Sequence, residues 1–112
     1  MQLSLERSGD VRIVRVNEPK LTYPVLSAFF DQVREVVAEG ARKLVIDLEV
    51  VAYIDSASIG CLMDIHRLFR QQDGALELTG LQPRVETLLS MTGVLRIIDV
   101  HRKASEALAG FA

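Results

Sequence analysis

The sequence predicts one α/β domain over residues 1–112, with a mixed, mostly parallel β-sheet, an N-terminal β-hairpin and about four helices. Two observations lead to this prediction. From residue 24 onward, helix-like segments alternate with strand-like ones, which is typical of βαβ units and parallel strands. Before them, residues 3–16 carry two strand-like patterns separated by Ser8-Gly9-Asp10, which predicts an antiparallel hairpin. A chain of 112 residues has the usual size of one domain with a single core.

The predicted elements have recognisable starts and ends. A helix is expected from about Pro24, with apolar side chains on one stripe and Gly40 placed to end it. Residues 43–48 predict a mostly apolar strand, and an apolar pattern at helical spacing runs from Ile59 until residues 71–74 break it. The remaining expectations are a strand over 75–79, a short helix from Pro83 to Gly93, a last strand over 94–98 and a last helix over 104–108.

Composition and charge exclude several classes of function. Thirteen basic and fifteen acidic residues give a net charge of −2, and neither sign forms a run that would attract nucleic acid or anionic lipid. No apolar run approaches the roughly 20 residues that span a bilayer. The single cysteine, Cys61, cannot form an internal disulfide, and Met1 is not followed by an export signal. We therefore expect a cytoplasmic protein that binds neither nucleic acid nor membranes.

The most informative stretch is Ile54-Asp55-Ser56-Ala57-Ser58-Ile59-Gly60, between the apolar strand and the helical pattern. Short polar side chains at this place favour a helix start, where unpaired N–H groups and the helix dipole produce partial positive charge. A hydroxyl group there can carry a phosphate. The stretch therefore predicts a serine that is modified, or one that only caps the helix.

The same stretch allows a second interpretation. Ser56-Ala57-Ser58-Ile59-Gly60 lacks one glycine of the Gly-x-Ser-x-Gly nucleophile elbow, which would make Ser58 the nucleophile of a small hydrolase. His101 is the histidine after the motif that could serve as its base, since His66 lies two turns along the same helix. His66 is expected as a partly buried, hydrogen-bonded side chain, and Cys61 as a small core residue. Two histidines and one cysteine provide no metal-ligand spacing, so we expect no metal or cofactor.

Several spaced motifs together resemble the STAS domain family, whose best-known members are bacterial anti-sigma factor antagonists. The resemblance covers about residues 43–108. It rests on Leu44-Val45-Ile46-Asp47-Leu48, Tyr53-Ile54-Asp55-Ser56, Ile59-Gly60, Gly74, Pro83-Arg84-Val85, Leu88-Leu89, Met91-Thr92-Gly93-Val94 and Ser105-Glu106-Ala107-Leu108, in that order.

The resemblance implies a function. In that family, the serine after the motif aspartate is phosphorylated by an anti-sigma factor that is also a protein kinase; here the pair is Asp55 and Ser56. The unphosphorylated form binds the kinase and frees a sigma factor, and a separate phosphatase restores it. This chain departs from the family at Ala57-Ser58, which leaves Ser58 as an alternative acceptor, and in the loop Glu18-Pro19-Lys20-Leu21-Thr22, where the family often has glycine and an acidic residue.

The sequence therefore predicts an anti-sigma factor antagonist that is not an enzyme. Its phosphorylation site is Ser56, and its partner-binding residues are Asp55, Ser56, Ala57 and Ser58. Its expected partners are an anti-sigma factor with serine kinase activity and a phosphatase that acts on phosphoserine. The alternative within the same fold is a constitutive STAS subunit of a larger assembly, such as a lipid-transport complex, in which Ser56 contacts a partner without being modified.

Overall fold

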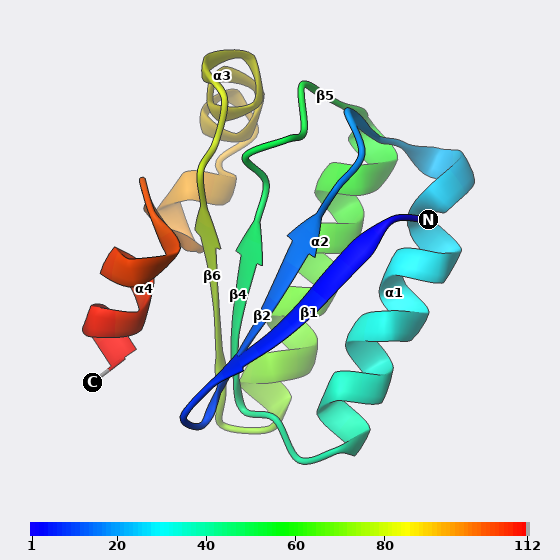
Figure 1. The fold of residues 1–112 in the computed structure, drawn as a ribbon. Coiled ribbons are helices and arrows are strands. Elements are labelled where there is room, and N and C mark those ends of the chain that lie inside the picture. The colour runs from blue at the N-terminus through cyan, green and yellow to red at the C-terminus, as the bar shows by residue number, and fades with distance from the viewer. Residues whose placement is uncertain (112) are drawn as a thin grey trace.

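A five-stranded mixed sheet forms the centre of the computed structural model, which describes residues 1–111 (Figure 1). The strand order is β1-β2-β4-β6-β7, with β1 antiparallel to β2 and every later neighbour parallel. The strands are β1 Leu3–Ser8, β2 Val11–Val16, β3 Lys20–Leu21, β4 Lys43–Asp47, β5 Tyr53–Ile54, β6 Ala75–Thr79 and β7 Asp99–His101. The helices are α1 Tyr23–Ala38, α2 Ser56–Gln71, α3 Pro83–Met91, the 3₁₀ turn η1 Val94–Arg96 and α4 Ala104–Phe111.

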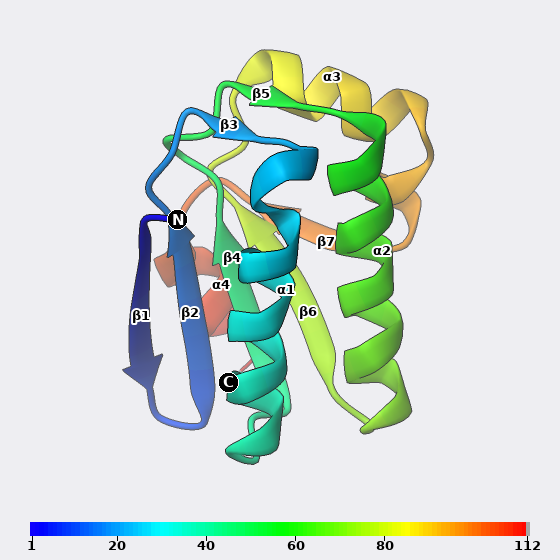
Figure 2. The same cartoon turned by 90° about the vertical axis from the view of Figure 1, so that its right-hand side faces the viewer.

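Helices cover both faces of this sheet. Helices α1 and α2 lie on one face and α4 on the other, while α3 lies at the end where the parallel strands finish (Figures 1 and 2). The main core lies under α1 and α2, and includes the fully buried Phe29 and Phe69. A smaller cluster on the α4 face joins Val45 to Ala107. The chain therefore buries both sides of its central strand β4, which explains why residues 43–48 are almost entirely apolar.

The predicted α/β architecture is confirmed, with its hairpin, its parallel strands and its four helices. The first helix begins at Tyr23, one residue before the predicted start, and Gly40 follows its end in the left-handed conformation at φ 99°. The helix predicted from Pro83 and the last helix are also present.

The predicted strand over residues 94–98 is wrong. Gly93, at φ 83°, reverses the chain after α3, and the 3₁₀ turn η1 follows, while the last strand, β7, begins at Asp99. Val94 and Ile98 are 2% and 1% exposed, whereas Ile97 is 52% exposed. Residues four apart lie on one face of a helical turn, so this apolar run is buried with helical rather than strand geometry.

A second, two-stranded sheet was not among the predicted elements. Strands β3 and β5 pair in parallel, with Lys20 opposite Tyr53 and Leu21 opposite Ile54. The Pro19 carbonyl accepts hydrogen bonds from the Ala52 and Tyr53 N–H groups at 2.8 and 3.1 Å. Figure 2 shows the two short strands crossing above the starts of α1 and α2. This pairing brings the loop after the hairpin beside the segment that leads into α2.

Candidate functional site

The start of α2 is fixed by a reciprocal capping box. Asp55 is the N-cap residue, and its Oδ1 accepts the Ser58 N–H at 2.8 Å. In return, the Ser58 hydroxyl oxygen accepts the Asp55 N–H at 2.9 Å. Each side chain thus satisfies a backbone donor that the helix leaves unpaired. The cap is Asp55 rather than Ser56, which is the first residue of the helix.

The carboxylate of Asp55 also contacts the start of α1. Its Oδ2 accepts the N–H of Tyr23, the first residue of α1, at 2.9 Å. The hydrogen bond from the Tyr23 N–H is the largest cause that holds the pKa of Asp55 below its usual value, and the bond from the Ser58 N–H is the next largest. One ionised side chain therefore joins the N-terminal ends of two helices, immediately before Ser56.

The two serines of the motif have opposite environments. Ser56 is exposed, and Ala57 is half-buried. Ser58 is fully buried, and its hydroxyl donates to the Asp55 carbonyl at 2.8 Å while it accepts the Asp55 N–H. A side chain in this position cannot contact a partner or enter a kinase active site. The expectations that placed Ser58 on the contact surface, or as an alternative phosphate acceptor, therefore do not fit the structure.

The hydrolase interpretation finds no support in this geometry. His101 is engaged elsewhere, with its Nε2 2.6 Å from Oε1 of the buried Glu77.

His66 is partly buried as expected, but within residues 1–111 its buried Nδ1 has no hydrogen-bond partner, which corrects the expectation of a hydrogen-bonded ring. Burial, Arg70 and Arg67 lower the pKa of His66. Burial, with a contribution from Asp64, raises the pKa of Cys61 to about 11, which makes its thiol a core group rather than a nucleophile.

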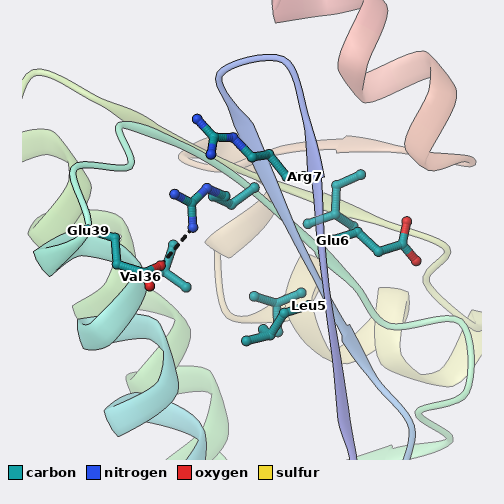
Figure 3. Close-up of a pocket in the computed structure, with 8 residues that line it drawn as sticks. Leu5, Glu6, Arg7, Val36 and Glu39 are labelled. Atoms are coloured by element: carbon teal, nitrogen blue, oxygen red, sulfur yellow. Dashed lines mark hydrogen bonds and ion pairs between the residues drawn. The ribbon is translucent and has the colours of Figure 1, made fainter.

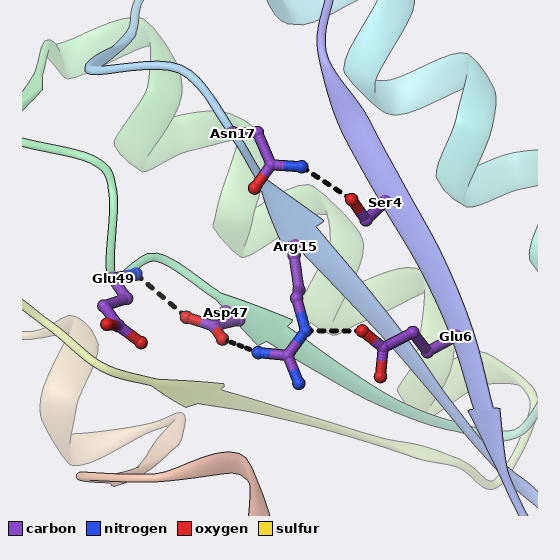
Figure 4. Close-up of polar contacts among 6 residues, drawn as sticks. All are labelled: Ser4, Glu6, Arg15, Asn17, Asp47 and Glu49. Atoms are coloured by element: carbon purple, nitrogen blue, oxygen red, sulfur yellow. Dashed lines mark hydrogen bonds and ion pairs between the residues drawn. The ribbon is translucent and has the colours of Figure 1, made fainter.

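A polar network fixes the adjacent edge of the main sheet. Arg15 on β2 forms ion pairs with Asp47 at the end of β4 and with Glu6 on β1 (Figure 4). Asp47 is 6% exposed, and its Oδ1 accepts the Glu49 N–H at 2.9 Å, which turns the chain as it leaves β4 toward β5. The contact with Arg15 lowers the pKa of Glu6. These contacts join the neighbouring strands β1, β2 and β4 near the end of the sheet where the chain leaves β4 toward β5 and the start of α2.

A hollow of about 230 Å³ lies elsewhere, between the hairpin and the second half of α1 (Figure 3). Leu5, Val36 and the Arg12–Glu39 ion pair line it, and none of the predicted site residues reaches it. Within residues 1–111, no group of three His, Cys, Asp or Glu side chains could hold a metal ion. In the same residues, no helix has the length and apolar character needed to cross a membrane.

The architecture is that of a small α/β domain with solved counterparts. It superposes on the crystal structure of the Thermotoga maritima protein TM1081 with a TM-score of 0.91, at 28% identity over 96% of this chain and 92% of that one. It also matches Bacillus SpoIIAA in its phosphorylated form, with a TM-score of 0.76 at 15% identity over 99% of this chain and all of that one, a likeness of fold alone.

The sequence profile of the STAS domain matches residues 2–107, and this chain therefore belongs to the STAS domain family. The resemblance stated from the motifs is confirmed. A curated relative is the anti-sigma-B factor antagonist of Bacillus subtilis strain 168, 34% identical over 68 residues. That alignment covers 61% of this chain and 62% of the relative, so the match spans a little under two thirds of the relative's length.

Proposed function

We propose that this protein is an anti-sigma factor antagonist whose binding is controlled by phosphorylation of Ser56. In its unphosphorylated form it binds an anti-sigma factor that is also a serine kinase, and a sigma factor is released. A phosphatase removes the phosphate and restores binding. The chain itself is a non-enzymatic binding module that acts in the cytoplasm. The observation that carries the proposal is the contrast at the start of α2, where Ser56 is exposed and Ser58 is sealed; membership of the family and the name of the B. subtilis relative support it.

The energetics favour a change in docking rather than in folding. A phosphoserine adds about −1.5 to −2 charges. The dipole and free N–H groups at a helix start stabilise such an anion by roughly 0.3–1 kcal/mol, while the ionised Asp55 beside it acts in the opposite direction. Burying the same dianion against a partner without matching cations costs several kcal/mol, and each 1.4 kcal/mol is about tenfold in affinity. Ser56 needs no base of its own, because the kinase provides ATP, metal and catalytic base.

The test begins with affinity capture from native cells on immobilised unmodified protein and on the Ser56→Asp variant, followed by mass spectrometry. A kinase-like protein retained by the first and lost from the second is then purified and incubated with this chain and ATP. We expect phosphate on Ser56, and no transfer to Ser56→Ala, which still binds. Ser105→Asp is the matched control, because Ser105 is also an exposed serine in the first turn of a helix, α4; it should bind like the wild type.

Two results would contradict the proposal. One is a native protein whose Ser56 stays unmodified in every growth condition, which favours the constitutive STAS subunit of a larger assembly. The other is a captured kinase that binds Ser56→Asp as well as it binds the wild type. Labelling of Ser58 by a fluorophosphonate probe would instead point to the hydrolase.

A further inference from the structure

The surface around Ser56 contains both tyrosines of the chain. Tyr23 is 75% exposed and Tyr53 is 44% exposed, whereas the phenylalanines are buried or half-buried. Tyr23 bonds to Asp55 through its N–H, and Tyr53 lies two residues before Asp55. Tyrosine is enriched at protein interfaces because it offers a large apolar area with few rotatable bonds. The capping contacts of Asp55 therefore gather the exposed aromatic residues of the molecule beside the proposed phosphorylation site.

Two cations belong to the same surface. Lys20 is exposed and pairs directly with Tyr53 across the β3–β5 sheet, whose other pair, Leu21 with Ile54, points inward. The Arg84 guanidinium, at the start of α3, lies 5.8 Å from the centre of the Tyr53 ring. A cation above an aromatic face forms a favourable cation–π contact that leaves its N–H donors free. The Tyr53 ring thus has Lys20 as its strand partner and Arg84 over its face.

The two cations of this surface have no acidic side-chain partner. Neither Lys20 nor Arg84 forms an ion pair with any side chain of residues 1–111. Glu86 is two residues from Arg84 on α3, a spacing at which helical side chains do not face each other. The carboxylate of Asp55 is already engaged by two backbone N–H groups. Beside the ionised Asp55, an incoming protein therefore meets two aromatic rings and two cations that form no ion pair.

We propose that Lys20, Tyr23, Tyr53 and Arg84 form the docking surface for the anti-sigma factor and that they fit an acidic face of that protein. This inference rests on the proposed function. The tyrosines are the anchors, and Lys20 and Arg84 pair with carboxylates of the partner. A phosphate on Ser56 places about −1.5 to −2 charges opposite those carboxylates, so the modification repels the partner directly. The Glu18–Thr22 loop, which departs from the usual family pattern, contributes Lys20 and leads into Tyr23, so it sets the specificity of this chain for its own kinase.

The test measures binding of the purified kinase, captured as described above, to four variants. Tyr23→Ala and Tyr53→Ala should each raise Kd by about tenfold or more. Lys20→Glu and Arg84→Glu should lower the association rate severalfold, and the loss should shrink at high salt because charge steering is screened. Ile97→Ala and Arg96→Glu are matched controls in the segment after α3, since Ile97 is 52% exposed and Arg96 is exposed. Both controls should bind normally, and all six variants should keep the wild-type circular dichroism spectrum.

The outcomes separate this inference from the function on which it rests. If Ser56→Asp loses the kinase but the four surface variants bind it as tightly as the wild type, the docking surface is wrong and the phosphorylation switch stands. If charge reversal at Lys20 and Arg84 strengthens binding, the face of the partner is basic and the proposed chemistry is wrong. If no kinase is captured, the proposed function and this surface both fail.

Discussion

At the scale of single residues, two serines that lie two positions apart in the sequence, Ser56 and Ser58, have different tasks. Ser58 is fully buried and closes the capping box with Asp55, while Ser56 is exposed at the first position of the helix. The structural serine and the proposed regulatory serine are thus different residues. Modification of Ser56 can therefore leave the helix start intact.

This division predicts unequal costs of truncation. Ser58→Ala leaves the Asp55 N–H without its acceptor in a partly buried position, and should lower the free energy of unfolding by about 1–2 kcal/mol. Ser56→Ala removes an exposed hydroxyl, and should change the free energy of unfolding by no more than about 0.5 kcal/mol. Urea unfolding of the two variants beside the wild type measures both values. Equal losses would show that the cap does not depend on Ser58.

Asp55 predicts how stability depends on pH. Its pKa is lowered in the folded state, chiefly by the Tyr23 and Ser58 N–H groups, so its contribution is fully present above its ordinary pKa of about 3.9. That contribution is lost as the pH falls through the lower pKa of the folded state. Asp55→Asn can still cap the helix but does not titrate. The stability difference between the wild type and Asp55→Asn should therefore shrink as the pH is lowered from 6 to below 3; a constant difference would contradict the assigned contacts.

At the scale of elements, local sequence patterns correctly predicted those helices, strands and turns whose structure depends mainly on their own residues. The Ser8-Gly9-Asp10 turn, the helix from Pro83 and the apolar strand over 43–48 were all predicted and are present. Residues 94–98 were misassigned because a short apolar run fits both the spacing of a helix and that of a strand. Only packing against the core selects the helical turn. The β3–β5 pair depends on a contact between residues more than thirty positions apart, for which neither segment carries a local signal.

The candidate site also contains some features that the local sequence predicts and others that depend on tertiary contacts. Asp55 and Ser56 could be predicted, because a short polar residue before an amphipathic pattern is a local signal. The burial of Ser58 was not predicted, although the spacing of Asp55 and Ser58 matches a reciprocal capping box and could have indicated it. The Tyr23 contact with Asp55 and the placement of Arg84 over Tyr53 depend on tertiary structure, so no sequence pattern could have shown them.

The glycine within α2 gives a prediction at this scale. A Cβ atom at Gly60 would meet nothing within 4 Å. The substitution Gly60→Ala therefore raises the helix propensity of α2 without a steric clash. We expect the free energy of unfolding to rise by about 0.5–1 kcal/mol. Gly80→Ala is the opposite case, because Gly80 has φ 72° and its Cβ would lie 3.1 Å from Asp47 Oδ1. That variant should be destabilised, and thermal unfolding of both proteins checks the two signs.

At the scale of the whole molecule, the site lies at the end of the sheet where the parallel strands finish. Helices α1 and α2 both begin there, and α3 lies over the same end (Figures 1 and 2). Open α/β sheets commonly bind their ligands at this edge, because strand ends and helix starts converge there on loops that need not pack into the core. The main core, by contrast, lies between the sheet and the long faces of α1 and α2. A charge added at Ser56 is therefore separated from the apolar contacts that hold the fold together.

That separation predicts a switch with almost no effect on global stability. Ser56→Asp places a negative charge near the N-terminal dipole of α2 and near the ionised Asp55, two small effects of opposite sign. We expect its free energy of unfolding to remain within about 0.5 kcal/mol of the wild type and its unfolding temperature within about 3 °C. Calorimetry on the wild type, Ser56→Asp and the Ser105→Asp control measures this, and amide hydrogen exchange should change only near residues 22–24 and 54–60. Exchange that accelerates throughout β4 and β6 would mean that the added charge acts by loosening the fold, and that loss of the partner follows from unfolding rather than from repulsion at the docking surface.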